Sequence, residues 1–212
     1  MPRIDDYKQA RDLAKNELLA TAPDLISGYS GADFHDRREN ERYLSLPFLN
    51  SRIKIEWPSF KILYEDSREE VPIQQQVLIL HYINGALSSK GARTTGQWIS
   101  FQDIPDGRFY LGAFVKRAKD PLIKIFGSNP KTLVEISSKA YEASPTDFGD
   151  FSVMLKPLPL VPMALVLWEG DEDFPPEGNI LFDENISKIF SAEDVSWLAG
   201  MVIYPMIGMA KS

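Results

Sequence analysis

The stretch Ile53-Lys-Ile-Glu-Trp-Pro-Ser-Phe-Lys-Ile-Leu-Tyr64 alternates apolar and polar residues on both sides of a Pro-Ser link. Alternation places every second side chain on the same face, so the pattern predicts two half-buried antiparallel strands, 53–57 and 60–64. The preceding segment, 43–49, is short and apolar. We expect the three segments to form a small meander.

Helical patterns flank this block of strands. Residues 4–19 carry apolar side chains at three- and four-residue spacing, which predicts an amphipathic helix. A second helix is expected over 72–83, because Pro72 suits its first position and Asn84-Gly85 suits its end. Its second half is apolar all round, which indicates a central position. The glycine-containing, charged segment 27–42 lacks periodicity and predicts a loop.

The second half of the chain mixes helix and strand signals. An aromatic segment, 98–114, precedes a helical pattern over 131–141. Three further strands are expected, at 152–156, 163–168 and 179–183. Prolines lack the backbone N–H that a strand ladder uses, so those between the first two should keep their connection irregular: Pro157, Pro159 and Pro162.

A capping box, Ser191-Ala-Glu-Asp194, opens the last predicted helix, and Pro205 should kink it. Strands in two blocks separated by helices predict the α+β class, with antiparallel strands and helices packed against them, rather than an alternating parallel sheet. We expect a single domain over 1–212, in which 1–42 is an N-terminal helix-and-loop appendage and 43–212 is the core.

Composition limits the classes of function. The chain has 212 residues, 44% of them hydrophobic, and a net charge of −7, which disfavours nucleic acid as a partner. It contains no cysteine, which excludes thiol nucleophiles, disulfides and cysteine-ligated clusters within it. The longest apolar run, Val161–Trp168, is far shorter than the about 20 residues of a membrane helix. With a charged start and no signal-peptide pattern, we expect a cytoplasmic protein that does not bind membranes.

The most unusual segment is WEGDEDFPPE at 168–177, which follows a predicted buried strand. It lies within 157–187, where there is no Lys or Arg but there are seven acids: Glu169, Asp171, Glu172, Asp173, Glu177, Asp183 and Glu184. Carboxylates crowded without cations raise one another's pKa or bind a cation. An exposed acidic turn, a ligand-facing edge, a divalent metal site and a general acid/base pair all remain open.

The second unusual segment surrounds the turn Pro105-Asp-Gly107 with aromatic residues. Rings beside Arg108 could line a pocket for a flat anionic ligand, because the guanidinium fixes a carboxylate or phosphate. The alternative is ordinary core with a surface arginine. Taken together, the two segments supply the candidate ligand-binding residues: Trp98, Arg108, Tyr110, Trp168, Glu169, Asp171 and Asp173. No catalytic residue, cofactor or metal ligand can be assigned.

Five stretches carry a family resemblance: LHYI at 80–83, TGQWISF at 95–101, IPDGRFY at 104–110, ALVLWEGDEDFPPE at 164–177 and NILFD at 179–183. With these, the chain resembles DUF3786, an uncharacterised family of anaerobic bacteria and archaea, over about 46–207. The resemblance implies no established reaction. It does imply a context, because some relatives carry an additional four-cysteine iron–sulfur domain like that of corrinoid iron–sulfur proteins. Any such partner of this cysteine-free chain would be a separate iron–sulfur or corrinoid protein.

Three functions are therefore expected in order of preference. The first is a module that binds a small molecule or cofactor where the aromatic and acidic segments meet. The second is a carboxylate-based or metal-dependent enzyme using Glu169, Asp171, Asp173 or Asp183, which requires one or two of these to be buried. The third is an interaction module that docks a basic partner through the acidic surface.

Overall fold

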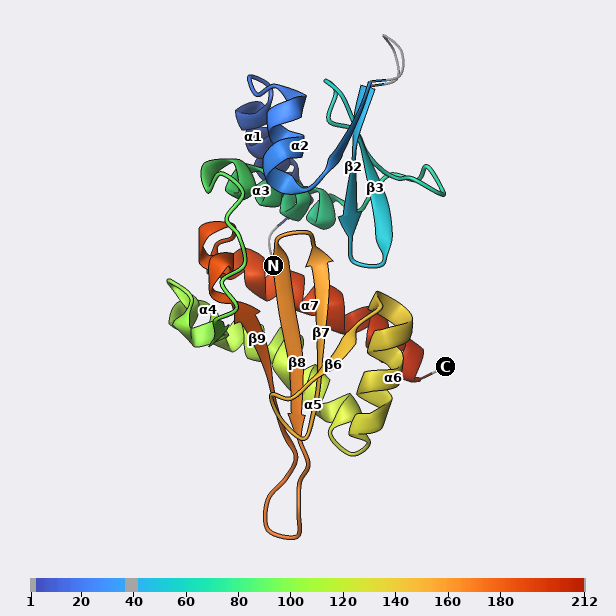
Figure 1. The fold of residues 1–212 in the computed structure, drawn as a ribbon, viewed down its shortest axis with the longest axis vertical. Coiled ribbons are helices and arrows are strands. Elements are labelled where there is room, and N and C mark those ends of the chain that lie inside the picture. The colour runs from blue at the N-terminus through green and yellow to red at the C-terminus, as the bar shows by residue number, and fades with distance from the viewer. Residues whose placement is uncertain (1–2, 37–41, 212) are drawn as a thin grey trace. The chain divides into compact units, whose positions relative to one another are not determined.

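The structure, a computed structural model, describes residues 3–36 and 42–211. Within them two antiparallel sheets, of four and five strands, organise the fold together with the helices packed against them (Figure 1). The expected α+β class is confirmed. The chain divides into two compact units: unit 1 comprises the described residues up to 93 with 158–160 and 188–190, and unit 2 comprises the remainder. The single-domain organisation over 1–212 stays a prediction.

Unit 1 contains the four-stranded sheet, with strand order β1-β2-β3-β4. Its elements are α1 (Ile4–Leu18), α2 (Pro23–Ser30), β1 (Asp33–Asp36), β2 (Arg42–Phe48), β3 (Ser51–Glu56), β4 (Ile62–Tyr64) and α3 (Ile73–Ser88). The predicted meander is confirmed, because β2, β3 and β4 pair in sequence and the alternating residues Ile53 and Ile55 are fully buried. The apolar second half of α3 is buried as expected.

Two expectations for unit 1 are wrong. The segment 27–42 is not one loop, since it contains the end of α2 and all of β1; residues 37–41 lie outside the described residues. β1 has few apolar residues, and its extended conformation is stabilised by pairing with β2. The helix α3 also does not close at Asn84-Gly85 but runs on to Ser88. Gly85 serves a close approach instead, because a Cβ there would collide with the carbonyl oxygen of Ile189.

Unit 2 contains the five-stranded sheet, with strand order β5-β9-β8-β7-β6. Its strands are β5 (Trp98–Ser100), β6 (Ser144–Thr146), β7 (Phe151–Leu158), β8 (Val161–Trp168) and β9 (Glu177–Asp183). Its helices are α4 (Gly107–Phe114), α5 (Asp120–Phe126), α6 (Pro130–Tyr141) and α7 (Ala192–Ala210), and a π-helical turn, Val115–Lys119, joins α4 to α5. Phe182 of β9 packs edge-on against Phe114 of α4, which joins this sheet to its helical layer.

The helices and strands predicted for the second half of the sequence are largely confirmed. Ser191 accepts a hydrogen bond from the backbone N–H of Asp194, as the capping box requires, and α7 continues through Pro205. The irregular connection expected around the prolines is wrong, because Pro157 and Pro162 lie inside β7 and β8. A strand tolerates proline where its ladder needs no N–H from that residue. No helix in residues 3–36 and 42–211 is long and apolar enough to span a membrane.

Candidate functional site

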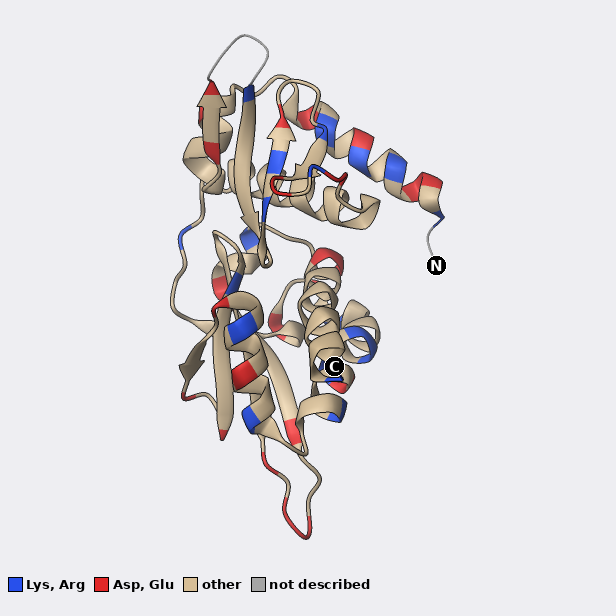
Figure 2. Cartoon of the chain, turned by 90° about the vertical axis from the view of Figure 1, so that its right-hand side faces the viewer, with Lys and Arg blue, Asp and Glu red and all other residues tan. Residues whose placement is uncertain are grey.

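An acidic loop, residues 169–176, joins β8 to β9 and extends beyond the ends of both strands (Figures 1 and 2). Four of its eight residues carry carboxylates, Glu169, Asp171, Glu172 and Asp173, and all four are exposed. The loop also exposes an aromatic ring, since Phe174 has 69% of its surface accessible. The acidic segment is therefore on the surface, at the end of a strand whose residues 161–167 are buried.

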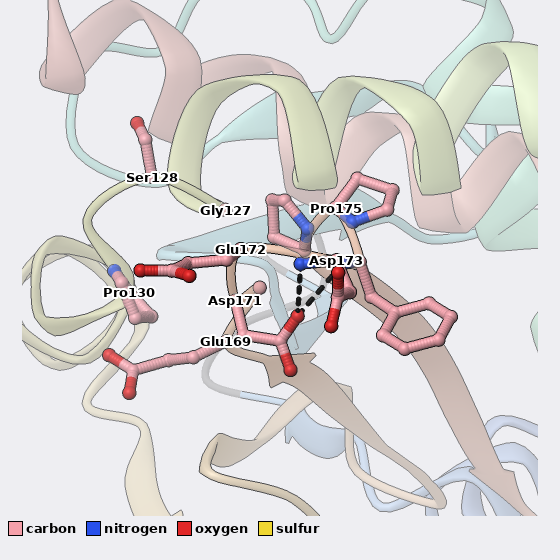
Figure 3. Close-up of a pocket in the computed structure, with 11 residues that line it drawn as sticks. Gly127, Ser128, Pro130, Glu169, Asp171, Glu172, Asp173 and Pro175 are labelled. Atoms are coloured by element: carbon pink, nitrogen blue, oxygen red, sulfur yellow. Dashed lines mark hydrogen bonds between the residues drawn. The ribbon is translucent and has the colours of Figure 1, made fainter.

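The loop has a defined conformation held by its own hydrogen bonds. The Oδ1 atom of Asp171 accepts the backbone N–H groups of Asp173 and Phe174, both at 2.8 Å (Figure 3). The N–H of Asp171 in turn donates to the carbonyl oxygen of Phe174 at 2.9 Å. Gly170 permits this tight turn, because a Cβ there would lie 2.6 Å from the backbone nitrogen of Pro176. One carboxylate thus shapes the loop.

A hollow of about 530 Å³ separates the acidic loop from the connection between α5 and α6. Glu169 and Glu172 extend across it toward Pro130, whereas Asp171 points to the other side of the loop (Figure 3). Pro176 anchors the loop to the opposite wall, where Gly127 leaves room for its ring. The hollow is open to solvent and combines carboxylates with proline rings, so it suits a cation that carries apolar groups.

The aromatic segment contributes mainly to the core. The rings of Phe101 and Phe114 are buried and stack with their centroids 4.1 Å apart. Trp98 lies on β5 opposite Asp183, and its ring is 5.2 Å from that of Phe148.

Trp168 ends β8 opposite Glu177 and leads into the acidic loop. Strand alternation along β9 puts Glu177 and Asp183 on one face, so their partners Trp168 and Trp98 share that face. Gly149 packs on the Trp168 ring. The connection between β6 and β7, which contains Phe148 and Gly149, thus links the two tryptophans.

Arg108 and Tyr110 lie elsewhere, on α4, and neither lines the hollow. Arg108 is exposed, and its charge interacts with the carboxylate of Asp103. The pKa of Asp103 is lowered chiefly by hydrogen bonds from Ser100, and the positive charge of Arg108 lowers it further. Tyr110 packs edge-on against Phe109. Of the seven candidates, the hollow gathers Glu169, Asp171 and Asp173, with Trp168 beside them. Whether the seven bind a ligand stays a prediction.

Asp183 is the buried carboxylate among the four proposed for catalysis, with 1% of its surface accessible. It accepts hydrogen bonds from the N–H groups of Thr95, Gly96 and Asn185 and from the Thr95 hydroxyl. Burial raises the pKa of Asp183, but these hydrogen bonds outweigh it and the pKa is lowered. The carboxylate is ionised and fully engaged by its own chain, which is the behaviour of a structural group.

Sequence reasoning missed the far wall of the hollow, Gly127, Ser128 and Pro130. Gly127 and Pro130 were visible as a break between helical patterns, but nothing local places them against residues 169–176. Asp150 was also missed, although its Oδ2 accepts the N–H of Glu169 at 2.8 Å and fixes the start of the loop. Among the described residues, no group of three or more His, Asp or Glu side chains is arranged to hold a metal ion.

Comparison with known proteins identifies one family. The model described as "Domain of unknown function (DUF3786)" matches residues 22–204, a span that includes both sheets, the hollow and the acidic loop. No curated protein and no solved structure matches the chain.

Proposed function

We propose, for a chain that belongs to the DUF3786 family, a binding function in which the acidic loop holds a positively charged partner, most favourably a basic surface of another protein. One observation carries the proposal. Among the described residues, none of the carboxylates of Glu169, Asp171, Glu172 and Asp173 forms an ion pair. An ordered loop that concentrates uncompensated charge attracts cations and accelerates their encounter.

A protein surface suits the loop better than a simple ion does. Phe174 is 69% exposed and Trp168 38% exposed beside the carboxylates. Aromatic rings next to acids complement lysine and arginine, whose stems pack on rings while their charges pair with carboxylates. Exposed aromatic residues are also frequent energetic centres of protein interfaces. The hydrogen bonds of Asp171 hold the loop in shape before binding, which lowers the entropy lost on association.

A small molecule or cofactor is the second candidate, and the hollow favours it. Its volume of about 530 Å³ falls within the usual range of ligand pockets. The carboxylates of Glu169 and Glu172 specify an organic cation. A flat anionic ligand held by Arg108 lacks support, because Arg108 is on α4 and outside the hollow.

An enzyme that uses carboxylates is the third candidate, and it requires one or two of them to be buried. Asp183 meets this requirement. The hydrogen bonds that engage its carboxylate leave it poorly suited to accept a proton from a substrate. The cytoplasmic location, the origin in anaerobes and a separate iron–sulfur or corrinoid protein as partner stay predictions. Any partner of the acidic loop should present exposed Lys or Arg.

The test uses a fluorescently labelled oligolysine peptide and measures its Kd by anisotropy. Glu169→Gln/Glu172→Gln removes two charges from the loop, and Glu135→Gln/Glu142→Gln removes two exposed charges from the region of α6. We expect the loop variant to weaken binding by about tenfold or more and the control by less than about twofold, with both effects suppressed by salt. Equal weakening by the two variants would mean that the peptide senses only net charge, and the proposal would be wrong. Titration with spermidine tests the small-cation candidate with the same variants.

A further inference from the structure

A π-helical turn, Val115–Lys119, interrupts the helical segment between α4 and α5. Such turns are rare, and they are frequent at functional sites. The helix α7 packs against this turn as well as against α4 and α5 (Figure 1). The turn therefore marks its contact with α7 as a candidate site that is separate from the acidic loop.

Arg117 of the turn lies over the ring of Trp197, which is on α7. The guanidinium carbon of Arg117 is 4.3 Å from the centroid of that ring. The contact holds the guanidinium in place, because its positive charge is attracted to the negative face of the ring. Both side chains are half-buried, so the pair is held close to the protein surface rather than extended into solvent.

The N–H donors of Arg117 have no partner within the described part of the chain. The guanidinium forms no ion pair and no hydrogen bond with any described residue. Two acids stand at helical spacing from the pair, Asp120 three residues after Arg117 and Glu193 four residues before Trp197, and Arg117 pairs with neither. A guanidinium presents its donors as a fork that fits two oxygens of a carboxylate or a phosphate. The ring thus orients Arg117 while the fork stays available to a ligand.

Gly200 brings a second aromatic residue to Arg117. Trp197, Gly200 and Tyr204 follow one another on α7 at three- and four-residue spacing, which places them on one face. A Cβ built on Gly200 would lie 3.7 Å from Cε2 of Tyr204 and 3.8 Å from Cβ of Arg117. Tyr204 has 56% of its surface accessible, and its hydroxyl forms no hydrogen bond with a described residue. A guanidinium, a hydroxyl and an exposed ring therefore gather around Gly200.

We propose that Arg117 and Tyr204 bind a small organic oxyanion, a carboxylate or a phosphate monoester that is attached to a flat apolar group. The fork of Arg117 binds two oxygens of the anion, and the Tyr204 hydroxyl donates a hydrogen bond to one of them. The exposed ring of Tyr204 packs on the apolar group of the ligand. Trp197 is a positioning residue, because it acts through the guanidinium. The site selects anions, whereas the acidic loop selects cations, so the two proposals stand or fall separately.

The experiment titrates isotope-labelled protein with benzoate and with phenyl phosphate in about 0.15 M NaCl, which screens non-specific attraction. NMR follows the Nε–H signal of Arg117 and the indole N–H signal of Trp197, and we expect both to shift saturably. Arg117→Lys keeps the charge but loses the fork, so the Kd measured at the indole should rise about tenfold or more. Arg108→Lys makes the same exchange at an exposed position of α4 and should change the Kd by less than about twofold.

Tyr204→Phe separates binding from folding. The substitution is at an exposed position, so thermal stability should be unchanged while the Kd rises about three- to tenfold through loss of the hydroxyl. Saturable shifts with one probe but not the other identify the anionic group that the site takes. Inorganic phosphate should bind more weakly than phenyl phosphate, because it has no apolar group. Neither signal moving with either probe overturns the inference, as do equal effects of Arg117→Lys and Arg108→Lys, which would mean that the probes sense only surface charge.

Discussion

Both carboxylate oxygens of Asp183 accept a hydrogen bond from the backbone N–H of Thr95, each at 3.0 Å. Thr95 precedes β5, and Asp183 ends β9, the strand with which β5 pairs. The Gly96 N–H, at 2.7 Å, and the Asn185 N–H complete the arrangement. A single buried charge therefore fixes the entry of the chain into unit 2 against the edge of its sheet.

Asp183→Asn should destabilise unit 2 by about 2–3 kcal/mol, because the amide has one acceptor oxygen and turns an NH₂ group toward backbone donors. Urea denaturation followed by tryptophan fluorescence measures the change. The neighbouring exposed residue Glu184 provides the control, and Glu184→Gln should alter the free energy of unfolding by less than about 0.5 kcal/mol. Similar losses in the two variants would contradict a specific role for the Asp183 carboxylate.

The stability of unit 2 should fall in acid because of the same group. The pKa of Asp183 in the folded protein is below its ordinary value of 3.8, so the unfolded chain takes up the proton first as the pH falls. The stabilisation is fully present above that ordinary value and is lost as the pH drops through the folded pKa. Urea midpoints between about pH 7 and about pH 3 should therefore decline more steeply for the wild type than for Asp183→Asn. Parallel curves would show that other groups control the acid transition.

Tyr82→Phe should destabilise unit 1 by about 1–3 kcal/mol, since it removes the hydroxyl that binds the carbonyl oxygen of the buried residue Ser30 and the backbone N–H of Leu160. The Tyr82 hydroxyl donates to the Ser30 carbonyl oxygen at 2.6 Å and accepts the Leu160 N–H at 3.3 Å. Burial raises the pKa of this phenol, so the group stays protonated in neutral solution. Thermal unfolding by circular dichroism measures the loss, and Tyr204→Phe, at an exposed position, is the matched control.

Gly85→Ala and Gly28→Ala should have opposite effects, although both glycines are in helices of unit 1. A Cβ at Gly85 collides with the Ile189 carbonyl oxygen, whereas a Cβ at Gly28 meets no atom within 4 Å. We expect Gly85→Ala to cost about 1–3 kcal/mol, by overpacking, and Gly28→Ala to be neutral or to stabilise by up to about 1 kcal/mol. Chemical denaturation measures the free energy of unfolding of the two variants side by side. An unchanged value for Gly85→Ala would contradict the close approach of Gly85 to Ile189.

The elements that could be predicted are those with strong local signals. Alternation around Ile53 and Ile55 identified strands because burial of one face imposes a period of two. Ser191 identified the start of α7 because its hydroxyl and Asp194 satisfy the free N–H groups of a helix end. β1 was missed, since its stability comes from pairing with β2 and leaves little trace in its own residues.

The candidate site was predictable only in part for the same reason. Residues 169–173 were identified by their composition, which is a local property. Their neighbours across the hollow, Ser128 and Pro130, are set by how α6 packs, which is a tertiary property. The expected meeting of Arg108 with the acidic segment depended on the same kind of information, and α4 lies at the other end of β9.

The division of the chain into two units limits how its coding sequence can be divided into fragments that encode a whole unit. Unit 1 is not one continuous piece of the chain. Residues 158–160 and 188–190 belong to it, although each of these segments lies between two segments of unit 2 in the sequence. One of them, Leu160, is hydrogen-bonded to Tyr82. A gene fragment ending after Arg93 would encode unit 1 without these six residues. Neither unit can therefore be exchanged, inherited or expressed intact through a single break in the coding sequence.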